Sequence, residues 1–206
     1  MQMQNRDAPV QCFKQFYKFI REMIDKLQTI LSMVNEWLKY AEAKNAVLLG
    51  FSGAGFTATI TYLSAASDIG QILEVGILIT TLLLCICSLI CSLSFLPKTN
   101  LEILIWRKQK PGRKSKGLPT DKDNLYFYGH LYKFNKDELL DALNRLYLEG
   151  LTKNLDKKEY GDLADQIIIN SEIAYMKFKF FTWASYFLIA ALLCTPFSML
   201  IGFLAS

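Results

Sequence analysis

Three long apolar runs divide the chain. Residues 45–67, 75–97 and 180–206 contain no Asp, Glu, Lys, Arg or His, and each run is at least 23 residues long. A helix needs roughly 20 residues to cross a hydrocarbon core about 30 Å thick. A core helix of a water-soluble protein rarely runs so far without a charge. The pattern therefore predicts three transmembrane helices, the first two forming a hairpin across the short turn 68–74.

Amphipathic segments flank these runs. In residues 13–41 apolar side chains recur at alternating steps of three and four, as on one face of a helix. The recurring positions are Phe13, Phe16, Ile20, Met23, Leu27, Ile30, Val34, Trp37 and Ala41. This helix packs either on other helices of the chain or on a second copy. Residues 161–181 mix polar and aliphatic side chains and lead directly into the third run, which predicts a helix that is half in water and half in lipid.

A helical domain is expected between the second and third spans. Asn135 and Glu138 have the spacing of a capping box, which predicts a helix from there to Gly150. The fold class is therefore an all-α membrane protein with three transmembrane helices and a cytoplasmic helical domain continuous with the spans. Its expected parts are an amphipathic helix (1–44), a two-span hairpin (45–97), the helical domain (98–179) and the third span (180–206).

Basic residues predict the orientation. Of the 23 Lys and Arg residues, 7 lie in residues 1–44 and 16 in residues 98–179, with none in 68–74 or at the C-terminus. Because basic residues near spans stay cytoplasmic, the N-terminus and residues 98–179 are expected inside and the C-terminus outside. Six cations within residues 107–116 predict contact with anionic lipid headgroups, and the alternative is that they recruit the phosphate of a nucleotide. Nucleic acid is not expected, since no readout module accompanies this charge.

Residue types that support catalysis are sparse. The chain has a single histidine, and its five cysteines, four of them in the predicted spans, do not match a common zinc pattern. Asp162 and Asp165 lie one turn apart, but acids near a helix start usually complement the helix dipole. The sequence contains no Walker motif and no nucleophile motif. We therefore expect no catalytic residue, no metal and no cofactor, which makes a membrane-anchored enzyme the weakest functional class.

Three groups of residues are candidates for binding a nucleotide. They are Glu42, Lys44 and Asn45 at the entry to the first span, Tyr128 and His130 in an aromatic segment, and Asp162, Asp165, Gln166 and Asn170 before the third span. Oxygen acceptors could read a base edge, an aromatic ring could stack on it, and a cation could meet a phosphate. The same residues would equally serve as interhelical hydrogen bonds and packing, so both interpretations stay open.

Small residues mark expected contacts inside the membrane. Gly50 and Ala54 form a strip in the first span along which another helix could approach closely. The third span carries a ridge at four-residue spacing, formed by Ala190, Cys194, Ser198 and Gly202. The ridge would dock either on the chain's own hairpin or on a neighbouring subunit. Pro196 lies within it and predicts a kink or weak point.

Residues 37–49, 125–143 and 162–181 resemble the Pycsar-type transmembrane effectors of bacterial anti-phage signalling. The resemblance implies a non-enzymatic effector gated by a cyclic nucleotide that a partner cyclase makes upon infection. Activation would then compromise the inner membrane and halt the infected cell, and the effector would form homo-oligomers. The identity of the nucleotide stays open. The alternative is a membrane scaffold or accessory subunit that binds no nucleotide.

Overall fold

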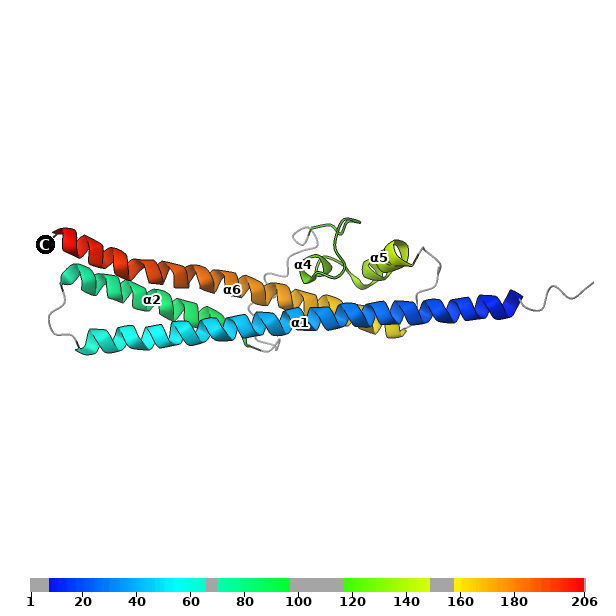
Figure 1. The fold of residues 1–206 in the computed structure, drawn as a ribbon, viewed down its shortest axis with the longest axis horizontal. Coiled ribbons are helices and arrows are strands. Elements are labelled where there is room, and N and C mark those ends of the chain that lie inside the picture. Colours follow the sequence, from blue (N-terminus) through cyan, green and yellow to red (C-terminus); the bar gives the residue numbers. More distant parts are fainter. Residues whose placement is uncertain (1–7, 66–69, 97–116, 149–157, 206) are drawn as a thin grey trace, which may run out of the picture. The chain divides into compact units, whose positions relative to one another are not determined.

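The computed structural model of the chain describes residues 8–65, 70–96, 117–148 and 158–205. Every regular element in these ranges is an α-helix (Figure 1). The helices are α1 (Ala8–Ala65), α2 (Gln71–Ser94), α4 (Tyr128–Leu131), α5 (Lys136–Tyr147) and α6 (Lys158–Ala205). The expected all-α fold class is confirmed.

Helices α1, α2 and α6 are the three in the described chain that are long and apolar enough to cross a membrane. Their qualifying segments are Ile20–Ala65, Gln71–Ser94 and Lys158–Leu204, which contain most of each of the three apolar runs. Both α1 and α6 also continue without a break through their amphipathic segments. The structure thus agrees with a helical domain continuous with the spans.

The chain divides into two compact units. Unit 1 comprises Met1–Leu38 and Pro111–Tyr175, and unit 2 comprises Lys39–Lys110 and Met176–Ser206. Helices α1 and α6 therefore contribute to both units, while α4 and α5 belong to unit 1 and α2 to unit 2. The divisions fall slightly before the hydropathy boundaries at residues 45 and 180.

The core of unit 1 is built from aliphatic side chains of all its helices. The predicted stripe of α1 lies in this core, where Met23, Leu27, Ile30 and Val34 are fully buried. Their neighbours include Leu131 from α4, Leu139 and Leu143 from α5, and Ala164 and Ile167 from α6. The stripe thus packs on the chain's own helices in residues 23–34, and the side chains of residues 8–17 lie outside the described ones.

Helix α5 begins with the capping box that the sequence predicts. The backbone N–H of Glu138 donates to Asn135 Oδ1 (2.8 Å), and the N–H of Asn135 donates to Glu138 Oε2 (3.0 Å). These two bonds satisfy backbone donors that a helix start would otherwise leave unpaired. The helix ends at Tyr147. The predicted end at Gly150 lies outside the described residues.

Unit 2 contains α2 and the second parts of α1 and α6. Its core cluster consists of Leu48, Cys87, Cys91 and Ala184. Large apolar side chains such as Leu82, Leu192 and Phe203 are exposed instead, with exposed fractions of 61%, 65% and 81%. Such an outward apolar surface suits a lipid environment, in which helices associate through small residues. The four cysteines with described side chains, Cys85, Cys87, Cys91 and Cys194, are free thiols.

The small-residue strip of α1 is not the surface that packs within the chain. Gly50 and Ala54 are exposed, and a Cβ added at Gly50 would meet nothing within 4 Å. Helix α1 instead turns Ser52 and Gly55 inward, where a Cβ at Gly55 would lie 3.1 Å from Leu84 Cδ1. Contact of the strip with another helix therefore stays a prediction about a second chain.

The ridge of α6 is partly occupied by the chain's own hairpin. Ser198 packs so closely on Gly76 of α2 that a Cβ at Gly76 would overlap its side chain, and Cys194 Sγ lies 3.6 Å from the Gly76 carbonyl. Ala190 is exposed, and a Cβ added at Gly202 would meet nothing within 4 Å. Helix α6 continues through Pro196 to Ala205.

Candidate ligand-sensing site

A buried carboxylate organises the segment that leads into α4. Asp123 accepts hydrogen bonds from the Thr120 backbone N–H (2.8 Å) and the Thr120 hydroxyl (3.3 Å), and it pairs with Lys133 Nζ at 2.8 Å. Burial alone would raise the pKa of Asp123, but the bonds from Lys133 and the Thr120 backbone outweigh it and hold the pKa below its usual value. Through these contacts with Thr120 and Lys133, the ionised carboxylate of Asp123 stabilises the fold of residues 120–133.

His130 also stabilises this segment, through a hydrogen bond to the backbone. Its Nδ1 accepts the backbone N–H of Asn124 at 2.8 Å, and Asn124 Oδ1 accepts the N–H of Tyr126 at 2.9 Å. An accepting Nδ1 places the proton of a neutral imidazole on Nε2. The Nδ1 atom of this single histidine therefore has a structural role in the loop. Its Nε2 atom takes no part in these two bonds.

An aromatic cluster joins α4 to α1. The ring of Trp37 lies 6.2 Å from that of Phe127 and 5.6 Å from that of Tyr128, and the last two rings are 4.7 Å apart. Gly129 makes this arrangement possible, because a Cβ at that position would lie only 2.5 Å from the Phe127 ring. The rings of Trp37, Phe127 and Tyr128 are therefore held against one another in unit 1.

A second ring pair joins α4 to α6. Tyr132 and Tyr175 are stacked with their centroids 4.2 Å apart and an angle of 11° between their planes. Burial raises the pKa of Tyr132, and the neighbouring Tyr175 raises it further; the same two causes raise the pKa of Tyr128. Both phenols are therefore neutral at physiological pH. Tyr175 is 36% exposed, so part of its ring remains open to a ligand.

The polar stripe of α6 lies on a different face from these rings. Asp162, Asp165 and Gln166 are exposed, whereas Asn170 is half-buried and its Nδ2 donates to Asn35 Oδ1 of α1 at 2.8 Å. Asn170 and Tyr175 are five positions apart, which separates them by about 140° around the helix. Asn170 is therefore engaged with α1, and a single site formed by the stripe and the aromatic segment stays a prediction.

The remaining candidates belong to unit 2, where they join α1 to α6. Glu42 pairs with Lys177 Nζ at 2.8 Å. Lys44 Nζ lies over the rings of Tyr40 and Phe181, 4.5 and 5.1 Å from their centroids. Asn45 is fully buried and donates through Nδ2 to the carbonyl oxygens of Ala41 (2.9 Å) and Lys177 (3.1 Å). These contacts favour the interhelical interpretation of the three residues.

Sequence reasoning missed Trp37, Tyr132 and Tyr175 as possible ligand contacts. A signal for one of them existed, since Tyr128 and Tyr132 are four positions apart and so lie on one face of a helical turn. No comparable signal connects Tyr132 with Tyr175, which is distant in the sequence. Among the residues that the structure describes, no group of three or more His, Cys, Asp and Glu side chains could hold a metal ion.

Comparison with known proteins agrees with the resemblance read from the sequence. The sequence model of the Pycsar effector protein domain, PycTM, matches residues 26–205. The Pycsar effector protein RsPycTM of a Rhizobium species is 27% identical over 146 residues, covering 71% of this chain and 77% of that protein. No solved structure matches the chain significantly. The chain therefore belongs to the Pycsar effector family, the membrane effectors of cyclic-nucleotide anti-phage defence.

Proposed function

We propose that a cyclic nucleotide made by a partner cyclase binds unit 1 of this protein and that binding impairs the integrity of the bacterial inner membrane, halting the infected cell. Membership of the Pycsar effector family supports this proposal. The three helices long enough to cross a membrane support it as well. The protein would act without catalysis, by changing its own helical contacts.

The stacked rings of Tyr132 and Tyr175 are the observation that carries the proposed site. Two parallel phenols 4.2 Å apart form a platform on which a nucleobase can stack, and Tyr128 lies beside them. Base stacking on an aromatic side chain contributes about 1–3 kcal/mol and tolerates different bases. Two hydrogen-bond donors close to Tyr132 in the sequence could meet the phosphate of the nucleotide. They are Nε2 of His130 and the ammonium of Lys133, which also pairs with Asp123.

Binding to the purified full chain tests the site. The probes are the 3′,5′-cyclic mononucleotides of adenine, guanine, cytosine and uracil, measured by calorimetry in detergent. Tyr175→Ala should weaken binding by about ten-fold or more, because it removes one stacking surface. Tyr175→Phe keeps the ring and is the matched control. Equal affinities of Tyr175→Ala and Tyr175→Phe would place the ligand elsewhere.

The polar stripe of α6 is the second candidate surface for the same ligand. The bond between Asn170 and Asn35 uses Nδ2 of Asn170 and Oδ1 of Asn35. It leaves Asn170 Oδ1 as an acceptor and Asn35 Nδ2 as a donor, both suited to a base edge. If this surface binds the nucleotide, Asn170→Ala and Asp165→Ala will each weaken binding while insertion into the membrane persists. If no cyclic nucleotide binds the parent protein at all, the scaffold alternative is favoured.

Self-association and lipid contact complete the proposal. The exposed strip around Gly50 and Ala54 supports close approach of a second copy, because small residues allow helix backbones to meet in lipid. The basic residues 107–116, which lie outside the described residues, would bind anionic headgroups. Light scattering of the purified protein, with and without nucleotide, should show more than one chain per particle, and Gly50→Leu should reduce that number.

A further inference from the structure

The buried face of α2 includes small and polar residues, although this helix has the composition of a membrane span. Its buried residues are Gly76, Ile77, Thr80, Leu84, Cys87, Cys91 and Ser94. Large aliphatic side chains such as Leu78, Leu82 and Leu89 point outward, with more than half of each exposed. Small and polar side chains therefore share the interior of unit 2 with apolar ones.

Hydroxyl groups meet across this interior at two levels. Ser88 of α2 donates to Ser52 of α1 at 2.9 Å, and Thr80 of α2 lies 3.0 Å from Thr195 of α6, oxygen to oxygen. Cys194 Sγ lies against the Gly76 carbonyl one turn further along. We define the polar seam by its members on the three helices, which are Asn45, Ser52, Gly76, Thr80, Ser88, Ser94, Thr195 and Ser198.

Two acceptors at one end of the polar seam are not satisfied by the residues that the structure describes. Asn45 Oδ1 and Ser94 Oγ are buried, with 0% and 4% of their residues exposed, and neither oxygen has a hydrogen-bond partner among the described residues. A buried polar atom without a partner is unfavourable unless water or an ion reaches it. These oxygens therefore indicate where a small hydrated ligand would be stabilised.

A large aliphatic side chain, Leu84, lies between the two hydroxyl pairs of the polar seam. Leu84 lies one helical turn from Thr80 and one from Ser88, between the two hydroxyl pairs, and is only 5% exposed. Its Cδ1 would lie 3.1 Å from a Cβ at Gly55 of α1, so the leucine occupies the space that this glycine leaves. A hydrophobic constriction in a polar path excludes water until the helices separate.

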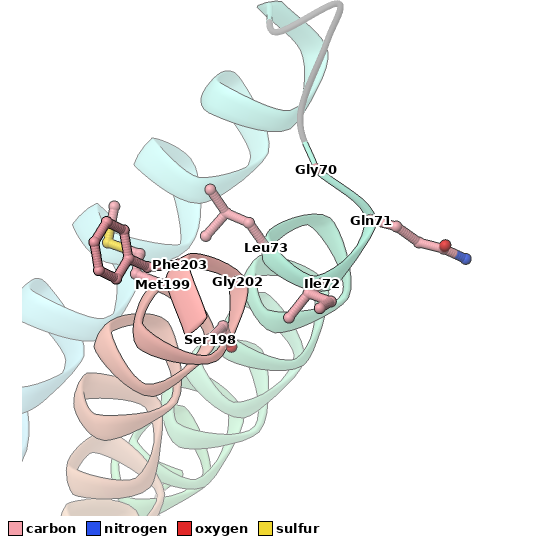
Figure 2. Close-up of a pocket in the computed structure, with 8 residues that line it drawn as sticks. All are labelled: Gly70, Gln71, Ile72, Leu73, Ser198, Met199, Gly202 and Phe203. Carbon is pink, nitrogen blue, oxygen red and sulfur yellow. The ribbon is translucent and has the colours of Figure 1, made fainter. Parts of the chain in front are cut away.

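The other end of the polar seam opens into a groove between α2 and α6 (Figure 2). It is lined by Gly70, Gln71, Ile72 and Leu73 from α2 and the residue before it, and by Ser198, Met199, Gly202 and Phe203 from α6. Figure 2 shows Ser198 and Gly202 on the side of α6 that faces Ile72 and Leu73, while Gln71 points away. Ser198 belongs to both the groove and the polar seam.

We propose that the polar seam, closed at Leu84, is the path of water and small monovalent cations through the activated protein. Its groups are hydroxyl, amide and carbonyl oxygens, and the three apolar runs that supply them carry no charged side chain. Neutral oxygens can replace the hydration shell of a cation, as carbonyl groups do in ion-selective filters. This inference rests on the proposed function in one respect, namely that binding of a cyclic nucleotide is what separates the helices.

Leu84→Ser tests the path without any nucleotide. The full-length variant is reconstituted into phosphatidylethanolamine–phosphatidylglycerol vesicles, and potassium efflux is recorded with a potassium-selective electrode. The serine should hydrate the constriction and raise efflux several-fold over the parent, while trapped carboxyfluorescein is retained. Leu84→Ala also opens the constriction and should likewise raise potassium efflux. It replaces Leu84→Ser in the assay if the serine variant does not accumulate.

Leu82→Ser is the matched control, because Leu82 is 61% exposed and faces away from the polar seam. It should leave efflux at the parental level, and adding Thr80→Val to Leu84→Ser should reduce the leak. Parental efflux from both Leu84 variants would overturn the proposal, as would equal leakage from Leu82→Ser or release of carboxyfluorescein. Since no nucleotide is present, these outcomes do not depend on whether unit 1 binds one.

Discussion

At the scale of single residues, unit 1 depends on directional contacts made by a few polar and small side chains. Asp123 joins Thr120 and Lys133, and His130 joins the backbone of Asn124. These bonds hold the aromatic rings of α4 in the positions that the proposed site requires. Their loss should therefore change stability first and ligand affinity as a consequence.

Asp123→Asn should destabilise the protein in a pH-dependent way. The carboxylate has a lowered pKa in the folded state, so its stabilisation is fully present above pH about 4 and is lost as the pH falls through the folded pKa. At neutral pH the substitution should cost about 1.5–3 kcal/mol, the usual contribution of hydrogen bonds to a charged group. Melting temperatures of parent and variant in detergent should differ at pH 7 and converge at acid pH. A difference independent of pH would contradict this role.

Gly129→Ala should disturb the ring cluster. The new Cβ would lie 2.5 Å from a Phe127 ring carbon, so the ring must leave its contact with Trp37. We expect a melting temperature several degrees lower, since overpacking costs about 1–3 kcal/mol. Combining it with Phe127→Leu, which removes the clashing ring atoms, should restore part of the loss relative to Phe127→Leu alone. Unchanged melting of the single variant would show that the ring is not confined.

Residues that share a helix face could be predicted from the sequence, whereas pairs distant along the chain could not. The stripe Met23, Leu27, Ile30 and Val34 follows from spacing alone, as does the Asn135–Glu138 box. The Asn35–Asn170 bond joins residues 135 positions apart. Its formation depends on the relative rotation of two helices, which local patterns do not specify.

At the scale of helices, burial follows different rules in the two units. In unit 1 the inward face of α1 is aliphatic, as hydropathy predicts. In unit 2 the same face continues as Asn45, Leu48, Ser52 and Gly55, most of it small or polar. Lipid solvates aliphatic side chains as well as a neighbouring helix does, so hydrophobicity no longer marks the buried side. For this reason the sequence does not distinguish Gly50 and Ala54, which are exposed, from Ser52 and Gly55, which face inward.

The ridge of α6 should respond differently at two of its positions. Ser198→Leu would collide with Gly76 and should reduce accumulation in the membrane fraction, because the α2–α6 contact leaves no space. Gly202→Leu meets open space and should accumulate normally. If Gly202→Leu also loses permeabilisation while it still binds nucleotide, the outer part of the ridge takes part in activation. Normal accumulation of Ser198→Leu would contradict the close packing at Gly76.

At the scale of the whole molecule, the expected topology depends on where the basic residues lie. A reporter placed after Ser206 should be active outside the cytoplasm, and one placed near Gly112 should be active inside, since residues 98–179 carry most of the Lys and Arg side chains. Alkaline phosphatase and a fluorescent protein report the two compartments. A reporter at Gly112 that is active outside would reverse the orientation and remove unit 1 from the reach of a cytoplasmic nucleotide.

Helices α1 and α6 each belong to both compact units, so ligand binding in unit 1 and permeation through unit 2 involve the same two helices. The most direct measurement of this coupling is potassium efflux from vesicles that contain the purified parent protein, recorded as each cyclic mononucleotide is added. We expect one nucleotide to start efflux from the parent and from Tyr175→Phe, but not from Tyr175→Ala at the same concentration. A nucleotide that binds the parent tightly and leaves its permeability unchanged would contradict the account.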